Sequence, residues 1–151
     1  MSQAAKSGND SLVINQHIFA NFADGDYCHL TYPNKVSVAK TGKNGNTIYA
    51  QNAMGLLANF SLRLIRGSTD DQYCQQLLNL QNNNYAGTAL LSGTYVKVIG
   101  DGQGNLINDT YILGGGTIEQ IPEGKSNAEG DTVQSVVEYK FVFANAPRVI
   151  A

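Results

Sequence analysis

The sequence has few of the residues that mark several common protein classes. It contains no Trp, three Pro, two Cys and two His in 151 residues, and only 15% of its residues are charged. Two cysteines, Cys28 and Cys74, are too few for a disulfide-stapled scaffold and lack metal-site spacing, so we expect reduced, structural thiols. No stretch approaches the roughly 18–20 apolar residues of a membrane helix. Residues 1–10 lack the basic start and apolar stretch of a signal peptide, so we expect a soluble protein that is not exported.

Positive charge is also scarce. Ten Lys and Arg stand against twelve Asp and Glu, a formal net charge of −2. A protein that grips nucleic acid through its phosphates needs a basic surface. The balance therefore disfavours tight DNA binding.

Catalytic and metal-binding patterns are weak. His17 and His29 are the sole histidine candidates for a general base, and no G-x-S-x-G elbow is present. The cluster Asp24, Asp26, Cys28 and His29 resembles a ligand set, but Asp24-Gly25-Asp26 is better explained as a turn. The glycines of 100–104 lack phosphate-loop spacing and favour a hairpin turn, with calcium a minor alternative. We therefore expect no enzyme, no metal and no cofactor.

Turn-forming residues are abundant. The chain has sixteen Gly and sixteen Asn, which both tolerate the positive φ values of tight turns, and 42% hydrophobic residues to form a core. We expect one domain over residues 1–151, with residues 1–10 a flexible N-terminal arm. Many turns imply many strands. Strands are expected at 12–19, 27–32, 36–40, 56–64, 89–99, 106–121 and 133–143.

A single helix is predicted after the strand at 56–64. Ser68 is an N-cap candidate, and Asp70 and Asp71 suit the first turn, which explains this acidic pair better than a catalytic dyad does. The helix should run from about Thr69 to Asn82 and end at Asn and Gly residues. Its core face is predicted to consist of Tyr73, Cys74, Leu77, Leu78 and Leu80.

The glycines 114–116 interrupt the strand at 106–121. Glycine within a strand pattern usually marks a bend or bulge, so we favour a bend over a ligand contact. The fold class expected is mainly β, an antiparallel β-sandwich or barrel with one α-helix inserted midway.

The order of these features resembles that of the tail tube proteins of contractile-tailed bacteriophages. The early strand ending at Phe22-Ala-Asp-Gly-Asp26, the hairpin tip at 40–47 and the strand leading into Arg66-Gly-Ser-Thr-Asp-Asp71 carry the resemblance. The glycine-bent segment 112–118 and the closing strand 138–143 complete it. None of these is a catalytic signature.

The resemblance implies that six copies form a ring and that rings stack into a hollow tube through which DNA passes. It implies sheath, baseplate and tape-measure proteins as partners, and a place in the virion tail after assembly in the host cytoplasm. Type VI secretion and tailocin tube proteins share such folds. A tube initiator or baseplate protein, or a small β-sandwich binding module, stays open as an alternative.

The polar loop between two of the expected strands is the candidate contact between rings. It comprises Thr41, Gly42, Lys43, Asn44, Gly45, Asn46 and Thr47. The loop is longer than strand connection requires, and ordering it costs entropy that docking on the next ring would offset. We therefore predict an axial stacking loop, with a mobile surface hairpin as the alternative.

Overall fold

The computed structural model describes residues 5–6, 10–23, 25–126, 128 and 132–151. Most of these residues form antiparallel sheet, with a single α-helix in this part of the chain. The strands are β1 (Ala5–Lys6), β2 (Ser11–Ile14), β3 (His17–Phe19), β4 (Cys28–Thr31), β5 (Ser37–Thr41), β6 (Thr47–Gln51), β7 (Ala58–Ile65), β8 (Leu91–Gly100), β9 (Leu106–Gln120), β10 (Val136–Asn145) and β11 (Arg148–Ile150). The helix is α1 (Thr69–Asn83), and the short 3-10 helices are η1 (Ala53–Leu56) and η2 (Thr132–Ser135).

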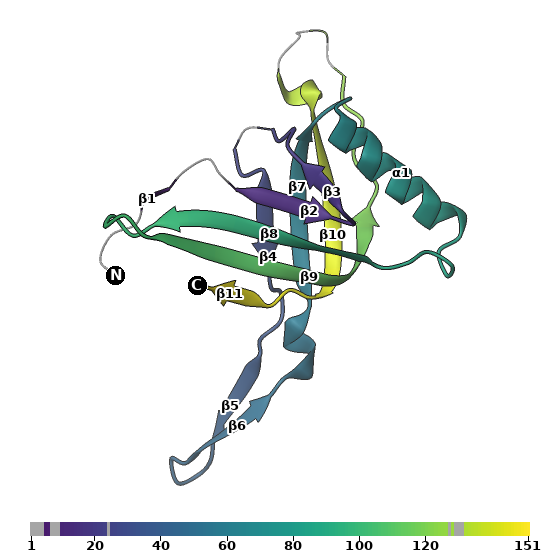
Figure 1. The fold of residues 1–151 in the computed structure, drawn as a ribbon. Helices are drawn as coiled ribbons and strands as arrows, with labels where there is room; N and C mark the ends of the chain where they lie inside the picture. The colour runs from purple at the N-terminus through teal and green to yellow at the C-terminus, as the bar shows by residue number, and fades with distance from the viewer. Residues whose placement is uncertain (1–4, 7–9, 24, 127, 129–131) are drawn as a thin grey trace.

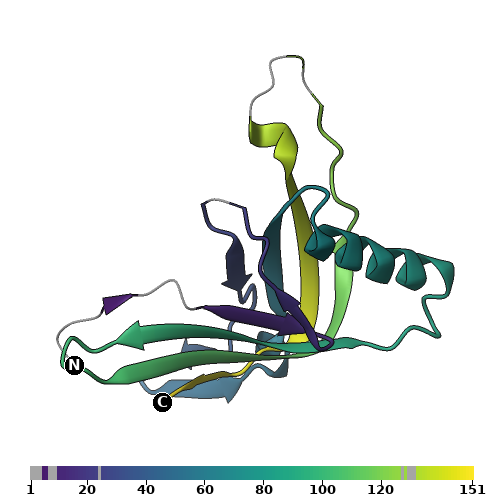
Figure 2. The same cartoon turned by 45° about the horizontal axis from the view of Figure 1, so that its top comes forward.

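One large sheet is bent into two parts, which Figures 1 and 2 show as separate limbs. Its strand order is β3-β2-β8-β9-β10-β7-β4, with β1 on β8 and β11 on β9. We call β2, β3, β8, β11 and residues 106–113 of β9 the wing. We call β4, β7, β10 and residues 116–120 of β9 the tower. The strand β9 therefore belongs to both limbs.

The bend lies at the three glycines of β9. Leu91 pairs with Gly116 whereas Gly93 pairs with Leu113, so β9 carries one extra residue there, which defines a β-bulge. Gly115 has a φ of +64°, a conformation that favours glycine. A Cβ on Gly116 would lie 2.3 Å from the ring of Phe143, so a side chain has no room. The predicted bend is confirmed.

The core lies between the inner faces of the wing, the tower and α1. The tower contributes alternate residues of β7 and β10, including the fully buried Phe60, Phe141 and Phe143. The wing contributes Leu12 and Ile14 of β2. The period-two alternation predicted for the strand at 56–64 holds from Ala58 to Leu64, but Leu56 falls in η1 and is exposed.

The prediction of a single strand at 12–19 is wrong. Residues 12–19 form two strands, β2 and β3, joined by a two-residue turn at Asn15 and Gln16. These residues have φ of 50° and 68°, as the type I′ hairpin turn requires at both central positions. The turn also fixes the register that places Leu12 opposite Phe19, and both are buried.

The fold class is mainly β, antiparallel and with one helix, as expected. The described strands leave free edges at β3 and β4 rather than pairing them into a closed barrel. One isolated bridge, Phe22 to Leu64, brings the segment after β3 beside β7. Of the predicted N-terminal arm, Ala5–Lys6 pair with β8, whereas residues 1–4 and 7–9 lie outside the described residues.

Candidate assembly interface

The strands β5 and β6 form a hairpin that projects from the rest of the molecule (Figure 1). They pair with each other, from Ser37 opposite Gln51 to Thr41 opposite Thr47, and form a two-stranded sheet of their own. At the tip the amide of Gly42 donates to the carbonyl of Asn46 at 2.7 Å, and Gly45 adopts a φ of +80°. The sequence-predicted loop 41–47 is therefore the end of a protruding hairpin.

Apolar side chains lie on both faces of this hairpin. Opposite residues in an antiparallel pair share a face. Val38 and Ile48 accordingly lie on one face and Tyr49 on the other, with exposed fractions of 44%, 67% and 76%. An isolated two-stranded hairpin is marginally stable in water, and the apolar groups on both of its faces remain exposed in the described part of the chain. These properties are typical of a segment that is completed by another chain.

The hairpin is also the basic part of an acidic molecule. Residues 33–52 contain Lys35, Lys40 and Lys43 and no Asp or Glu. The remainder of the chain has seven Lys and Arg against twelve Asp and Glu. Charge complementarity would steer the hairpin toward an acidic surface.

The base of the hairpin is held in place by specific contacts. The side-chain amide of Asn52 donates to the carbonyl of Lys35 at 2.7 Å, and its backbone N–H donates to Val36 at 2.8 Å. A Cβ on Gly55 would lie 2.6 Å from the carbonyl oxygen of Lys35, so η1 packs directly on the segment that leads into β5. The direction of the hairpin is therefore set by the body.

An open groove runs beside this base. It is lined by Tyr32, Val36, Leu56, Tyr111, Pro147 and Arg148. The Tyr32 hydroxyl donates to the carbonyl of Ala146 at 2.5 Å, and Arg148 pairs with Asp109 through two bonds of 2.8 and 2.9 Å. Burial raises the pKa of the Tyr32 hydroxyl, so it remains a donor at neutral pH.

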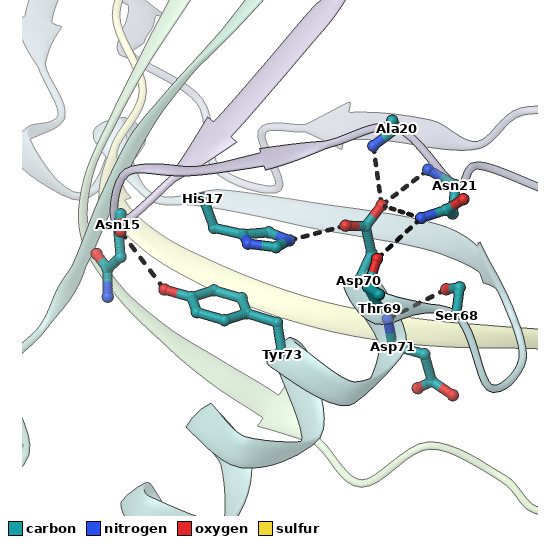
Figure 3. Close-up of polar contacts among 9 residues, drawn as sticks. All are labelled: Asn15, His17, Ala20, Asn21, Ser68, Thr69, Asp70, Asp71 and Tyr73. Carbon is teal, nitrogen blue, oxygen red and sulfur yellow. Dashed lines mark hydrogen bonds and ion pairs between the residues drawn. The ribbon is translucent and has the colours of Figure 1, made fainter.

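A second polar cluster, drawn in Figure 3, surrounds the start of α1. The carboxylate of Asp70 is buried and accepts from the ring of His17 at 2.7 Å and from the amides of Ala20 and Asn21 at 2.8 Å each. Burial alone would raise the pKa of Asp70, but these donors outweigh it and hold the pKa below its usual value. The ring of His17 stacks on that of Tyr73, with centroids 4.1 Å apart.

The arrangement explains the acidic pair at the start of the helix. Ser68 caps α1 by accepting from the amide of Asp71, as predicted. Asp71 accepts from the amide of Gly67 at 2.9 Å and from the hydroxyl of Tyr139 at 2.7 Å. Asp70 fastens the helix to the segment that follows β3, and Asp71 fastens it to β10. The two carboxylates thus have different partners and do not form a dyad.

The predicted core face of α1 is correct except at its last residue. Cys74 and Leu78 are buried, and Tyr73 and Leu77 are half-buried. Leu80 is 61% exposed, and Gln81 takes its place in the core. The Gln81 amide donates to the carbonyl of Ile118 and accepts from its N–H, at 2.9 and 3.1 Å. This satisfies backbone groups of β9 that leucine would leave unpaired. The helix ends at Asn83, and its C-cap Asn84 has a φ of −150° rather than the expected left-handed conformation.

The remaining candidates from the sequence are the two cysteines, the metal-like cluster at 24–29 and the turn at 101–105. Cys28 and Cys74 are free thiols. Burial raises the pKa of Cys28 to about 12 and raises that of Cys74, so both resist ionisation. Asp24 of the metal-like cluster lies outside the described residues, and the described residues contain no group of three or more potential ligands. In the 101–105 turn, the side-chain carboxylate of Asp101 accepts from the backbone amides of Gln103 and Asn105.

No helix in the described part of the chain has the length and apolar character needed to cross a membrane. Comparison with protein-family models gives no match, and the search of curated proteins gives none either.

Proposed function

We propose that this chain is the structural subunit of a phage tail tube, in which six copies form a ring and rings stack into a hollow tube that conducts DNA. Its proposed partners are further copies of itself, the sheath, the baseplate and the tape-measure protein. The number of copies and the partners follow from the resemblance of the sequence to tail tube proteins. The observation that carries the proposal is the β5–β6 hairpin.

The hairpin supports the proposal because it is built for contact with another molecule. It extends away from the core, exposes Val38, Ile48 and Tyr49 on its two faces, and concentrates positive charge on an otherwise acidic chain. A segment that leaves one subunit and docks on a different surface of the next makes a heterologous contact, which generates rings or filaments. We assign the tip, Thr41–Thr47, to the contact between successive rings.

Free sheet edges support lateral assembly. Within the described residues, β4 pairs with β7 alone and β11 with β9 alone, which leaves one edge of each strand without a partner. Unpaired edges invite pairing with another chain, and closure into a ring removes them. Pairing between neighbouring subunits would extend each bent sheet into a continuous ring.

The test is the assembly state of the full chain, measured by size-exclusion chromatography with light scattering and by negative-stain microscopy. We expect rings or tubes, with a melting temperature that falls on dilution because association stabilises the folded subunit. A monomer at every concentration would overturn the proposal and favour a binding module. A ring that never polymerises would point to an initiator or baseplate protein.

A hairpin variant makes the test specific. Replacing Ile48 and Tyr49 by Thr and Ser should leave the circular dichroism spectrum unchanged and abolish tubes, because both side chains lie on the projecting hairpin. Ile65→Thr, which removes a 47% exposed apolar side chain from the end of β7, is the matched control and should assemble normally. Equal loss of tubes in both variants would argue against a specific role for the hairpin.

A further inference from the structure

The tip of the β5–β6 hairpin carries an Asn-Gly pair. Asn44 is the only Asn in the sequence that Gly follows. In such a pair the Asn side chain reacts readily with the backbone nitrogen of the next residue, because glycine has no Cβ to obstruct the approach. The residues from 41 to 50 are all exposed, and the tip lies at the far end of the projecting hairpin (Figure 1). Water therefore has free access to the pair.

The local geometry leaves both reacting groups accessible. Gly45 has a φ of +80°, and a Cβ at this position would meet no atom within 4 Å. Its amide donates to the carbonyl of Gly42 at 3.1 Å, and this bond closes the turn. Among the described residues, no hydrogen bond or ion pair holds the side chain of Asn44. Opening the exposed bond to Gly42 is thus enough to free the nitrogen of Gly45 for reaction.

Two other asparagines in exposed turns are held by hydrogen bonds. The side-chain oxygen of Asn84 accepts from the amide of Gly87 at 3.2 Å. The side-chain amide of Asn105 donates to the carboxylate of Asp101 at 2.9 Å. Both precede a large side chain rather than glycine. Asn44 therefore differs from them both in its neighbour and in the freedom of its side chain.

The reaction that this pair can undergo is deamidation, and it needs no reagent besides water. The backbone nitrogen of Gly45, after losing its proton to base, attacks the side-chain carbonyl carbon of Asn44. The new N–C bond closes a cyclic imide, and the side-chain nitrogen leaves as ammonia. Water then cleaves one of the two C–N bonds of the imide. Cleavage at the side-chain carbonyl gives Asp, and cleavage at the main-chain carbonyl gives isoaspartate.

Either product changes the character of the hairpin. Residues 33–52 carry positive charge and contain no Asp or Glu, so deamidation places their first carboxylate, next to Lys43. Isoaspartate also routes the main chain through the former side chain, which adds a methylene between the paired Thr41 and Thr47. Both changes fall on the segment that we assign to the contact between rings.

We infer that Asn44 is a site of spontaneous deamidation in the free subunit and that docking of the hairpin protects it. The protection rests on the proposed function, because a docked tip would keep the bond between Gly45 and Gly42 closed. The reaction itself does not depend on assembly, since both reacting groups belong to one chain. Subunits that stay unassembled thus acquire negative charge at the tip, and their hairpins become poorer partners for an acidic surface.

Peptide mass spectrometry of the full chain tests the site. Dilute free subunits are incubated in neutral and in mildly alkaline buffer, and peptides that contain residues 41–47 are separated so that Asp and isoaspartate are resolved. Asn46, which Thr follows in the same loop, is the internal control. Asn44→Gln is the matched variant, because its longer side chain closes a ring much more slowly.

We expect Asn44 to convert to both products, at a rate that rises with hydroxide concentration because the attacking nitrogen must lose its proton. Asn46 and the Gln side chain of Asn44→Gln should stay unchanged over the same time. No conversion of Asn44, or conversion no faster than that of Asn46, would overturn the inference.

The same measurement on assembled tubes tests the protection. We expect Asn44 to stay intact in tubes while free subunits in the same buffer lose it. Equal loss in tubes and in free subunits would overturn the protection, although the tubes themselves would leave the proposed function standing. If no ring or tube forms, the proposed function fails, and conversion in free subunits still decides whether Asn44 is a deamidation site.

Discussion

The outer faces of the wing and the tower belong to one continuous sheet and differ in charge. On the tower, Arg63 of β7 lies opposite Glu138 of β10, and Lys140 follows on the same face. On the wing, the outward positions carry uncharged side chains, and the apolar Ile18, Leu106 and Val149 among them are at least half exposed. The strand β9 contributes to both limbs, so the two outer faces do not differ in charge simply because they come from different strands.

The absence of charge on the outer face of the wing is therefore a local property, and it does not simply follow from the low charge of the whole chain. The wing does contain cations, Lys97 and Arg148, but they point inward, where Asp10 and Asp109 pair with them. Taking charges from water costs free energy that only a partner can offset. Here the desolvation falls mainly on the carboxylates, because Asp10 and Asp109 keep only 8% and 10% of their side-chain exposure while Lys97 and Arg148 keep 31% and 51%.

The largest loss of stability is expected when the wing strands are separated from each other. A Cβ on Gly93 would lie 2.1 Å from the carbonyl oxygen of Val13, which is backbone and cannot move aside without displacing β2 from β8. We expect Gly93→Ala to destabilise the fold by about 3 kcal/mol or more. Urea denaturation measures the change. Gly124→Ala, where no atom lies within 4 Å of the added Cβ, is the control and should change little.

A smaller loss is expected from weakening the attachment of α1. Asp70→Asn removes a buried carboxylate that accepts from His17, Ala20 and Asn21, and should cost about 2 kcal/mol at pH 7. Glu138→Gln, on the exposed outer face of the tower, should have a much smaller effect. Equal stability of Asp70→Asn and the wild type would show that α1 does not depend on this carboxylate.

The free energy of unfolding that the Asp70 carboxylate contributes should depend on pH. The folded-state pKa of Asp70 is lowered, so its stabilisation is fully present above the unfolded pKa, about 3.9, and is lost as pH falls through the folded pKa. The difference between wild type and Asp70→Asn should therefore be largest near pH 7 and shrink below about pH 4. Chemical denaturation of both proteins across this range gives the result. A difference that grows toward low pH would contradict the assigned direction.

Shortening the hairpin should block assembly and leave the folding of the subunit intact. Replacing Lys43 through Asn46 by Asn-Gly leaves a three-residue loop, Gly-Asn-Gly, between the paired Thr41 and Thr47, and loops of this length are common in hairpins. The free energy of unfolding should change by less than about 1 kcal/mol, and tube growth should stop at single rings. Microscopy and analytical ultracentrifugation measure ring and tube populations. Tubes of normal length and salt resistance would exclude the stacking role.

The smallest change in stability, within about 0.5 kcal/mol, is expected from adding a charge to the uncharged outer face of the wing. Asn108→Lys places an ammonium at an exposed position of the wing, and Ser61→Lys places one on the outer face of the tower. Urea denaturation of both variants measures the change. A loss above about 1 kcal/mol in Asn108→Lys alone would show that the outer face of the wing does not tolerate a charge.

Local signals predicted much of the fold. Alternation between Ala58 and Leu64 placed the central tower strand, and the acidic first turn after Ser68 placed α1 to within one residue at its end. These predictions succeeded because the signals are contained within a few consecutive residues. The glycine bend was also readable, since three consecutive glycines leave few alternatives inside a strand.

Other features depended on tertiary contacts that sequence spacing does not contain. The turn at Asn15 and Gln16 was missed because it lacks the glycine that usually marks a type I′ turn. Leu80 was assigned to the core by helical spacing, but Gln81 is buried because β9 offers it a backbone donor and acceptor. The apolar faces of the hairpin could not be predicted, because apolar residues in a strand pattern are usually buried and the sequence does not show that Val38, Ile48 and Tyr49 project from the body.

The central position of β9 has a consequence for folding kinetics. This strand pairs with β8 before it in the chain and with β10 and β11 after it, while β2, near the N-terminus, pairs with β8 some eighty residues later. Most of the sheet therefore consists of pairings between distant residues, and such topologies fold slowly, on the scale of milliseconds to seconds. We expect subunit folding to be the slow step at high protein concentration and ring formation to be the slow step at low concentration.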